Sequence, residues 1–456
     1  MLDPANPVVR SENSSLMHSS NEVHLAKQTK VCHTIVPLPV VPISTDAGTV
    51  RLASTSLRLN PKVIGVCLFL FLTYATATVF VREAWALQSF QVGIFVLLAI
   101  YLVVGIRSSS ELVEHSWPAV LVYFVPIWGL LQIVARTTSS TFNTRAAVLR
   151  WGALAGVFFL TQSIARTRTA RRNILSAFLV FATAMAVLCM TQLFTSDGKV
   201  LWIFDSGFPD VYATFPSYNN YAQFAELALP IALWRALREG WRSWWYVLSG
   251  GALYGSVIGS ASRAGTALCT AEVLAMMVIG LVKLRDPETG LPSRSTTSMV
   301  LVVPLLAAVF TLAVGWERVW ERFQQNDPYL VRKEFMIAAV DMAKQRPMIG
   351  YGLDTFPAVY QRYAIRDFPF FANHTHNDWA EFAADGGIPF LLLLLIPFSS
   401  AVPIVIRNPW GLGLVSVMLH ACVDFPFPRP AVSGWMFMLL AVLYMSRATQ
   451  SSVPRK

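Results

Sequence analysis

A series of long apolar segments constrains this chain more than any other feature. About twelve of them lie between residues 61 and 446, and many approach or exceed the roughly 20 residues that cross a bilayer as a helix. The segments are continuously apolar, whereas the strands of a membrane β-barrel would alternate apolar and polar residues. Only 14% of the residues are charged, compared with about a quarter in soluble proteins. The sequence therefore predicts an all-α polytopic membrane protein.

The expected spans also define the organisation of the chain. They cover residues 63–81, 90–106, 118–135, 147–164, 174–194, 220–237, 244–260, 265–283, 299–315, 387–406, 410–424 and 431–446. One large loop, residues 316–387, separates the ninth span from the tenth, and an amphipathic helix is expected at its start, lying on the membrane surface. The predicted parts are a disordered cytoplasmic tail (1–60), an N-terminal transmembrane bundle (61–244), a core that includes the large loop (245–400), and C-terminal transmembrane helices with a short tail (401–456).

The basic residues predict how the spans are oriented. The formal net charge is +10, and lysine and arginine are concentrated in alternate loops, which are therefore expected to be the cytoplasmic loops. Both termini are then cytoplasmic, and the large loop faces outward. Orientation of the helices explains the positive net charge better than binding of a nucleic acid does.

The segment from residue 369 to 390, PFFANHTHNDWAEFAADGGIPF, gathers the most titratable side chains at the edge of a span. Such groups are expensive to hold there and indicate a functional site. A helix beginning near residue 373 would place His374, Asn377, Asp378 and Glu381 on one face and His376 on another. His376 is the candidate general base, since a neutral histidine accepts a proton near pH 7. A zinc site built on the two histidines and a purely structural helix cap are the alternatives.

Three further polar groups lie at the expected outer ends of spans. Arg263, in SASRAGT, is a candidate for binding phosphate, or it is an interfacial anchor that snorkels to the surface. Asn219 or Asn220 either caps the sixth span or contacts a sugar or phosphate, and Glu226 in the same span should face the interior. His420 and Asp424 are four residues apart and could hold one another, which favours a structural role.

Several segments in this order resemble the O-antigen ligase and polymerase superfamily of bacterial envelope glycosyltransferases. They are SYNNYAQFAELALPIAL, IGSASRAGTAL, RKEFMIAAVDMAKQRPMIGYGLDTF, HTHNDWAEFAADGGIPF and HACVDFPFPRPA, between residues 217 and 431. The resemblance is carried mainly by residues 245–400. It implies a multi-spanning inner-membrane enzyme with a large periplasmic loop. Such enzymes transfer a glycan from undecaprenyl diphosphate to lipid A-core, a growing chain or a protein hydroxyl.

The resemblance also implies roles for individual residues. The loop histidine that precedes an asparagine is His376 before Asn377, the arginine among small residues is Arg263, and Arg332 resembles the arginine that opens the loop helix. The chain departs from the family in one place, because it has no arginine between residues 191 and 231. A second arginine that binds the diphosphate would have to be Arg332, Arg362 or Arg366.

These observations together predict a metal-independent glycosyltransferase, a ligase or a polymerase, that needs no cofactor. Its partners are the lipid bilayer, an undecaprenyl-diphosphate-linked glycan donor and a saccharide or lipid-core acceptor. The predicted catalytic residues are His376 and Arg263. The predicted substrate-binding residues are Arg332, His374, Asn377, Asp378, Glu381 and Asn220. A transporter or flippase of a lipid-linked glycan is the alternative, although the chain shows no clear internal repeat.

Overall fold

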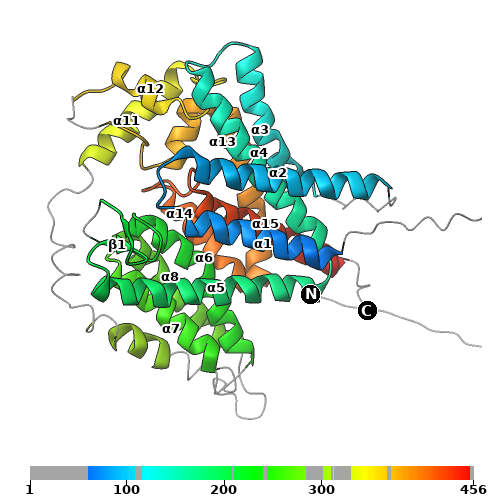
Figure 1. The fold of residues 1–456 in the computed structure, drawn as a ribbon, viewed down its shortest axis with the longest axis vertical. Coiled ribbons are helices and arrows are strands. Elements are labelled where there is room, and N and C mark those ends of the chain that lie inside the picture. The colour runs from blue at the N-terminus through cyan, green and yellow to red at the C-terminus, as the bar shows by residue number, and fades with distance from the viewer. Residues whose placement is uncertain are drawn as a thin grey trace, which may run out of the picture. The chain divides into compact units, whose positions relative to one another are not determined.

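The structure is a computed structural model that describes residues 60–107, 116–207, 210–239, 244–283, 301–309, 312, 330–366 and 371–451. Of the expected N-terminal tail (1–60) only residue 60 is described. The first part of the large loop (316–329) and the basic connection at 284–300 lie outside the described residues. Over the described ranges the chain forms α-helices, short 3-10 turns and a two-stranded antiparallel hairpin (Figure 1).

The long helices follow the apolar segments of the sequence. In the first half they are α1 (Pro61–Ala77), α2 (Ala84–Arg107), α3 (Trp117–Val134), α4 (Thr141–Ile164), α5 (Arg168–Thr195), α6 (Tyr218–Glu239), α7 (Trp244–Gly259) and α8 (Arg263–Lys283). In the second half they are α11 (Leu330–Gln345), α12 (Phe356–Val359), α13 (Asp378–Arg407), α14 (Leu412–His420) and α15 (Pro430–Ser451). The strands β1 (Lys199–Val200) and β2 (Phe204–Asp205) lie between α5 and α6.

Seven of the described helices are long and apolar enough to cross a membrane: α2, α3, α4, α5, α8, α13 and α15. Two shorter apolar helical segments, Pro61–Ala77 and Pro409–His420, accompany them. The class of fold, an all-α polytopic membrane protein, is thereby confirmed. The count of twelve spans and the boundaries of the predicted domains remain predictions.

Helix α6 occupies the centre of the packed helices. Almost all of its residues from Asn219 to Leu237 are buried, including the polar Gln223 and Glu226. Helices α5, α7, α8, α14 and α15 all pack against it. The expectation that Glu226 faces the interior is therefore confirmed. A helix surrounded in this way can carry polar side chains because it does not face lipid.

The described part of the large loop has a small core of its own. Phe335, Ala338 and Met342 of α11 are buried together with Phe356 of α12 and Tyr360 of the following 3-10 turn. Helix α11 packs on α13, and Figure 1 shows the two beside each other at one end of the helices. The apolar face of α11 is thus covered by protein rather than laid on a membrane surface. The sequence pattern showed an apolar face but not what would cover it.

Helix α13 differs from its predicted span because it begins nine residues earlier, inside the expected loop. It starts at Asp378 and bends at Gly387, whose φ is 74°. A side chain at Gly387 would meet the carbonyl oxygen of Pro347 at 2.7 Å. Glycine at this position therefore allows the bend of α13 to pass close to the segment that follows α11. The polar first turns of α13 are held in place by this packing.

Candidate active site

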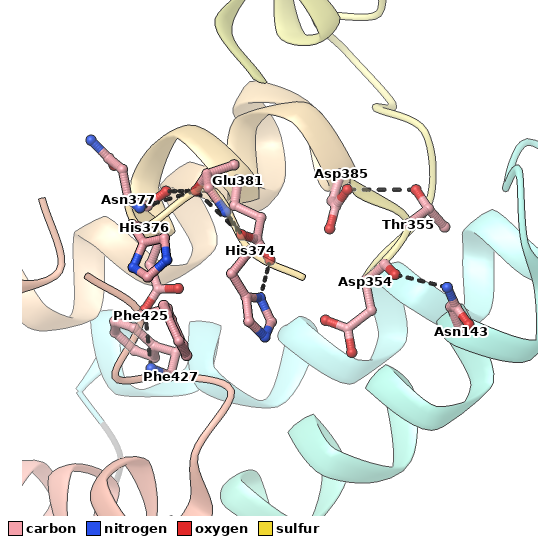
Figure 2. A network of polar contacts seen from close by, with 12 residues as sticks. Asn143, Asp354, Thr355, His374, His376, Asn377, Glu381, Asp385, Phe425 and Phe427 are labelled. Atoms are coloured by element: carbon pink, nitrogen blue, oxygen red, sulfur yellow. Dashed lines mark hydrogen bonds and ion pairs between the residues drawn. The ribbon is translucent and has the colours of Figure 1, made fainter. Parts of the chain in front are cut away.

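The loop before α13 is organised by hydrogen bonds to Glu381. One carboxylate oxygen of Glu381 lies 2.9 Å from Nδ1 of His374, and the other accepts a bond of 2.8 Å from the backbone N–H of Thr375. Asn377 caps α13, because its Oδ1 accepts a bond of 3.0 Å from the N–H of Ala380. The helix thus starts at Asp378, not near residue 373 as the sequence suggested, so the expected helical face does not form. The loop nevertheless brings His374 and Glu381 together (Figure 2).

His376 has a different partner and an unusual backbone conformation. Its Nδ1 lies 3.2 Å from Oδ1 of Asp424, and its φ is 54°, in the left-handed region that few residues other than glycine adopt. The His376 side chain is 30% exposed, whereas that of Asp424 is only 2% exposed. Among the described residues no group bonds to Nε2 of His376. This nitrogen is available to a substrate, and the strained conformation that presents it is a feature common at functional sites.

Asp424 belongs to the connection between α14 and α15, residues 421–429. Its Oδ1 also accepts a bond of 3.0 Å from the N–H of Phe425, and Arg332 of α11 donates a bond of 2.9 Å to the neighbouring carbonyl of Val423. Burial opposes a charge on Asp424, but the hydrogen bond from His376 and the nearby positive charges of His376, His420 and Arg332 hold its pKa below the usual value. Asp424 is therefore a carboxylate aimed at His376.

Asp378 fastens this connection to the start of α13. Its Oδ2 accepts a bond of 3.0 Å from the N–H of Phe427, and its own N–H donates to the carbonyl of Ala421 at 2.9 Å. The side chain is completely buried. Asp378 thus determines where the connection carrying Asp424 lies relative to the loop carrying His376.

Phe425 is packed between the two histidines. Its ring stacks on His374 with centroids 4.5 Å apart, and it meets His376 edge to face at 4.9 Å (Figure 2). Aromatic contacts of this kind fix ring orientation. Phe425 therefore adds to the hydrogen bonds that hold both imidazoles.

Arg263 is positioned by a second set of contacts, at the first residue of α8. Ser262 donates a bond of 2.8 Å to Oδ1 of Asn219 and accepts one of 3.2 Å from the N–H of Gly265. A side chain at Gly265 would lie 2.4 Å from Cβ of Ala222, so α8 and α6 start in close contact. Arg263 is half-buried beside this junction. The start of α8, which carries Arg263, is therefore packed against the start of α6, which carries Asn219 and Asn220.

A cavity of about 870 Å³ lies next to Phe425. Asn220, Asn373, Phe425 and Arg429 line it, together with residues from the end of α1 and the start of α2, such as Leu87. Asn220 also donates a bond of 2.9 Å to Gln223. Of the residues predicted to bind substrate, Asn220 is the one that contributes directly to the cavity wall. The volume lies within the range of small-molecule sites.

Two features of this region were not assigned from the sequence. Asp424 was expected to pair with His420, but its carboxylate bonds to His376 instead, although the N–H of Asp424 still donates a bond of 3.0 Å to the carbonyl of His420. His420 pairs instead with Glu226 at 2.7 Å, and both side chains are fully buried. Arg429 was not singled out at all. Its signals in the sequence were its position between two apolar segments and its place in HACVDFPFPRPA, one of the segments that carry the family resemblance.

Zinc ligation was an alternative for the two histidines. Over the part of the chain that the structure describes, no group of three or more histidine, cysteine, aspartate or glutamate side chains is arranged to hold a metal ion. His374 and His376 are directed to different carboxylates, Glu381 and Asp424.

The fold and site define a multi-pass membrane protein with a histidine–aspartate pair and a cavity at the ends of its helices. Residues 246–395 match the family model described as O-antigen ligase. The resemblance to the O-antigen ligase superfamily is thereby confirmed, and the match indicates a ligase- or polymerase-type function in polysaccharide assembly. It includes Arg263, Arg332 and His376, whereas Asn220 and Asp424 lie outside it. No curated protein matches the chain.

Proposed function

We propose that this protein is a membrane glycosyltransferase of bacterial cell-surface polysaccharide assembly. It moves a glycan from undecaprenyl diphosphate to an acceptor hydroxyl at the outer side of the inner membrane, with both of its own termini in the cytoplasm. The family match over residues 246–395 supports the class of reaction. The observation that carries the chemical assignment is the His376–Asp424 pair at 3.2 Å.

The pair suits general-base catalysis. Asp424 holds the proton on Nδ1 of His376, so that Nε2 carries the lone pair and faces the acceptor. As the acceptor oxygen forms its bond to the anomeric carbon, the hydroxyl proton passes to Nε2. The buried carboxylate of Asp424 then stabilises the imidazolium that forms.

The leaving group needs charge stabilisation rather than a proton. The bond between the anomeric carbon and the phosphate oxygen breaks, and its electron pair departs with the diphosphate. Arg263 lies at the start of α8, and its guanidinium cannot lose its proton, which suits it to the charge that develops. One displacement of this kind inverts the anomeric centre, and it requires no metal or cofactor.

The other predicted residues support this reaction. Arg332 fixes the backbone next to Asp424, and Asp378 holds the same connection to α13. His374, Asn377 and Glu381 shape the loop beside His376, and Asn220 contributes to the cavity. We assign the first two to positioning and the last four to contacts around the substrate.

Deletion of the gene, followed by complementation with wild type or His376→Ala, tests the function. We expect the His376→Ala strain to accumulate lipid-linked glycan and to lose surface polysaccharide while the protein is present at normal level. Single repeats on the accumulated lipid would identify a polymerase, and long chains a ligase. Full complementation by His376→Ala would contradict the assignment and favour a transporter of the lipid-linked glycan.

A further inference from the structure

A second cavity, of about 680 Å³, lies between the turn that joins α3 to α4 and the segment that follows α11. Figure 1 shows this turn at the same end of the helices as α11 and α12. The cavity is lined by Arg136, Thr137, Thr138, Ser139, Gln345, Arg346, Pro347, Met348 and Ile349. Among these described residues are two guanidinium groups and three hydroxyls but no carboxylate. The cavity therefore offers hydrogen-bond donors and positive charge to an anion.

The two walls of this cavity are joined to each other by hydrogen bonds. The backbone N–H of Ser139 donates to the carbonyl of Tyr351 at 2.7 Å. The side-chain amide of Gln132 donates to the carbonyl of Ile349, also at 2.7 Å. The cavity is thus formed before a ligand binds, which reduces the free energy spent on ordering its walls.

Arg346 is held in place on the wall that follows α11. It donates a bond of 3.3 Å to the carbonyl of Thr137, and its guanidinium carbon lies 4.4 Å from the centroid of the Tyr351 ring. These contacts orient the guanidinium but leave N–H groups for a ligand, since arginine has five. Asp341, the acidic residue in the last turns of α11, is paired with Lys344 at 2.9 Å. Among the described residues no carboxylate forms an ion pair with Arg346.

Arg136 carries the charge of the other wall, and its backbone is strained. Helix α3 ends in a Schellman turn, in which the N–H of Thr137 donates to the carbonyl of Gln132 at 3.0 Å. The φ of Arg136 in this turn is 53°, a conformation usually taken by glycine because it has no Cβ. The side chain is exposed, and within the described ranges no carboxylate forms an ion pair with it. An arginine that takes a glycine position at a conformational cost indicates a role for its side chain.

The charge of this turn is not explained by orientation of the helices. The predicted orientation places the turn between the third and fourth spans on the outer side, whereas the positive-inside rule concentrates lysine and arginine in cytoplasmic loops. An interfacial anchor that snorkels to the surface would explain one exposed arginine. It would require neither the strained backbone of Arg136 nor a second arginine on the opposite wall.

An apolar face of α3 leads to the cavity. The residues exposed along it are Phe124, Ile127, Leu131 and Val134. Because they are three or four positions apart, they share one face of the helix, and that face ends beside the turn that carries Arg136. In a multi-pass membrane protein an exposed apolar helix face contacts acyl chains, and the lipid phosphates lie near the level at which the helix ends.

We propose that this cavity binds the phosphate of an anionic phospholipid of the outer leaflet, between Arg136 and Arg346. Two guanidinium groups bind the oxygens of one phosphate through charge-assisted hydrogen bonds, and the hydroxyl of Ser139 adds a donor from the wall of Arg136. The acyl chains lie along the exposed face of α3, and the lipid joins the α3–α4 turn to the base of the large loop. The inference is independent of the proposed glycan transfer, because neither arginine belongs to the candidate active site.

Titration of the purified, delipidated full-length protein with phosphatidylglycerol, followed by native mass spectrometry, tests the site. We expect Arg136→Gln and Arg346→Gln each to raise the Kd by about 10- to 100-fold, the loss of a hydrogen bond to a charged group. Phosphatidylcholine, whose head group has no net charge, should bind the wild-type protein weakly. The matched control is Arg145→Gln, an exposed arginine in the first turns of α4 that does not line the cavity, and it should bind as wild type does.

Arg136→Gly separates binding from folding. Glycine adopts a positive φ without steric cost, so the lipid-free variant should melt at a temperature no lower than that of wild type. Its affinity for phosphatidylglycerol should nevertheless fall as far as that of Arg136→Gln. The lipid should raise the melting temperature of the wild-type protein, because it binds the folded state, and should raise that of Arg136→Gly much less.

Three results would overturn the assignment. Unchanged binding by the double variant Arg136→Gln/Arg346→Gln would place the lipid elsewhere. An equal loss with Arg145→Gln would show a general attraction to the basic surface instead of a site. Displacement of phosphatidylglycerol by millimolar inorganic phosphate would show that the cavity takes a free anion without any contribution from the acyl chains.

Discussion

Two histidine–carboxylate pairs meet at the short stretch from His420 to Asp424, and they are built for different purposes. His420 and Glu226 lie 2.7 Å apart, and both side chains are fully buried. Asp424 and His376 lie 3.2 Å apart, and the imidazole is 30% exposed. The first pair joins α14 to α6 inside the protein, whereas the second joins two loops at the edge of the cavity.

The difference shows that access, not residue type, decides which pair can react. Removal of either partner of a buried pair strongly destabilises the fold, because the remaining charged or polar group is left without a hydrogen bond in a medium of low polarity. An exposed imidazole with a buried carboxylate behind it can exchange a proton with a substrate. We therefore expect changes to the first pair to act on stability and changes to the second to act on rate.

The largest expected effect is that of His376→Ala on the rate. Loss of a general base lowers a rate by about 100- to 10,000-fold, and we expect a loss in this range for glycan transfer by the purified protein. The melting temperature should change little, because the side chain is partly exposed. A large fall in melting temperature with a normal rate per folded molecule would instead assign a structural role to His376.

Glu226→Ala should have the opposite profile. Removal of one partner of a buried pair costs about 3–5 kcal/mol of stability, so we expect low yield and a clearly lower melting temperature in detergent. Glu226→Gln, which keeps an acceptor for His420, should lose less. Glu239→Ala is the matched control, because its ion pair with Arg172 is exposed and contributes at most about 1 kcal/mol. Equal effects of Glu226→Ala and Glu239→Ala would refute the structural role.

Asp424→Asn should lower the rate by about 10- to 100-fold, less than loss of the base itself. It also has a defined pH dependence. Because the pKa of Asp424 is lowered in the folded protein, its stabilisation is complete above its unfolded pKa of about 4 and is lost only as the pH falls through the lower folded value. The gap in melting temperature between wild type and Asp424→Asn should not shrink between pH 8 and pH 5. A gap that closes over this interval would show that Asp424 is not held ionised.

The smallest effect is expected for His374→Ala. His374 is 19% exposed and is bonded to Glu381, and it lies across Phe425 from the cavity side of the site. We expect a rate reduction of less than about tenfold, the general range for one hydrogen bond, measured in the same transfer assay. A loss as large as that of His376→Ala would mean that the two histidines act together.

The fold could be predicted from the sequence because the bilayer imposes it. Apolar segments of about 20 residues have few structures open to them besides a helix, and helices such as α2, α5 and α13 follow these segments. The residue at which α13 begins was harder to predict than the existence of the helix. It depends on the cap by Asn377 and on the close passage at Gly387, and both are set by tertiary packing.

The site could be predicted only where its residues are neighbours in the chain. His376, Asn377 and Glu381 were recognisable as one polar segment. The partner of His376 is 48 positions away, and the helical spacing of His420 and Asp424 suggested the wrong pair. The packing of α6, α13 and α14 decides which distant side chains come into contact. This packing cannot be inferred from a single sequence.

The measurement that tests the account most directly is a double-mutant cycle on His376 and Asp424. Transfer from an undecaprenyl-diphosphate-linked glycan to its acceptor would be measured with purified wild type, His376→Ala, Asp424→Asn and the double variant. If Asp424 acts through His376, the double variant should be no slower than His376→Ala alone, because residues that work as a unit are not additive. Losses that add in full, or no transfer even by the wild-type protein, would contradict the assignment of this pair as the catalytic base.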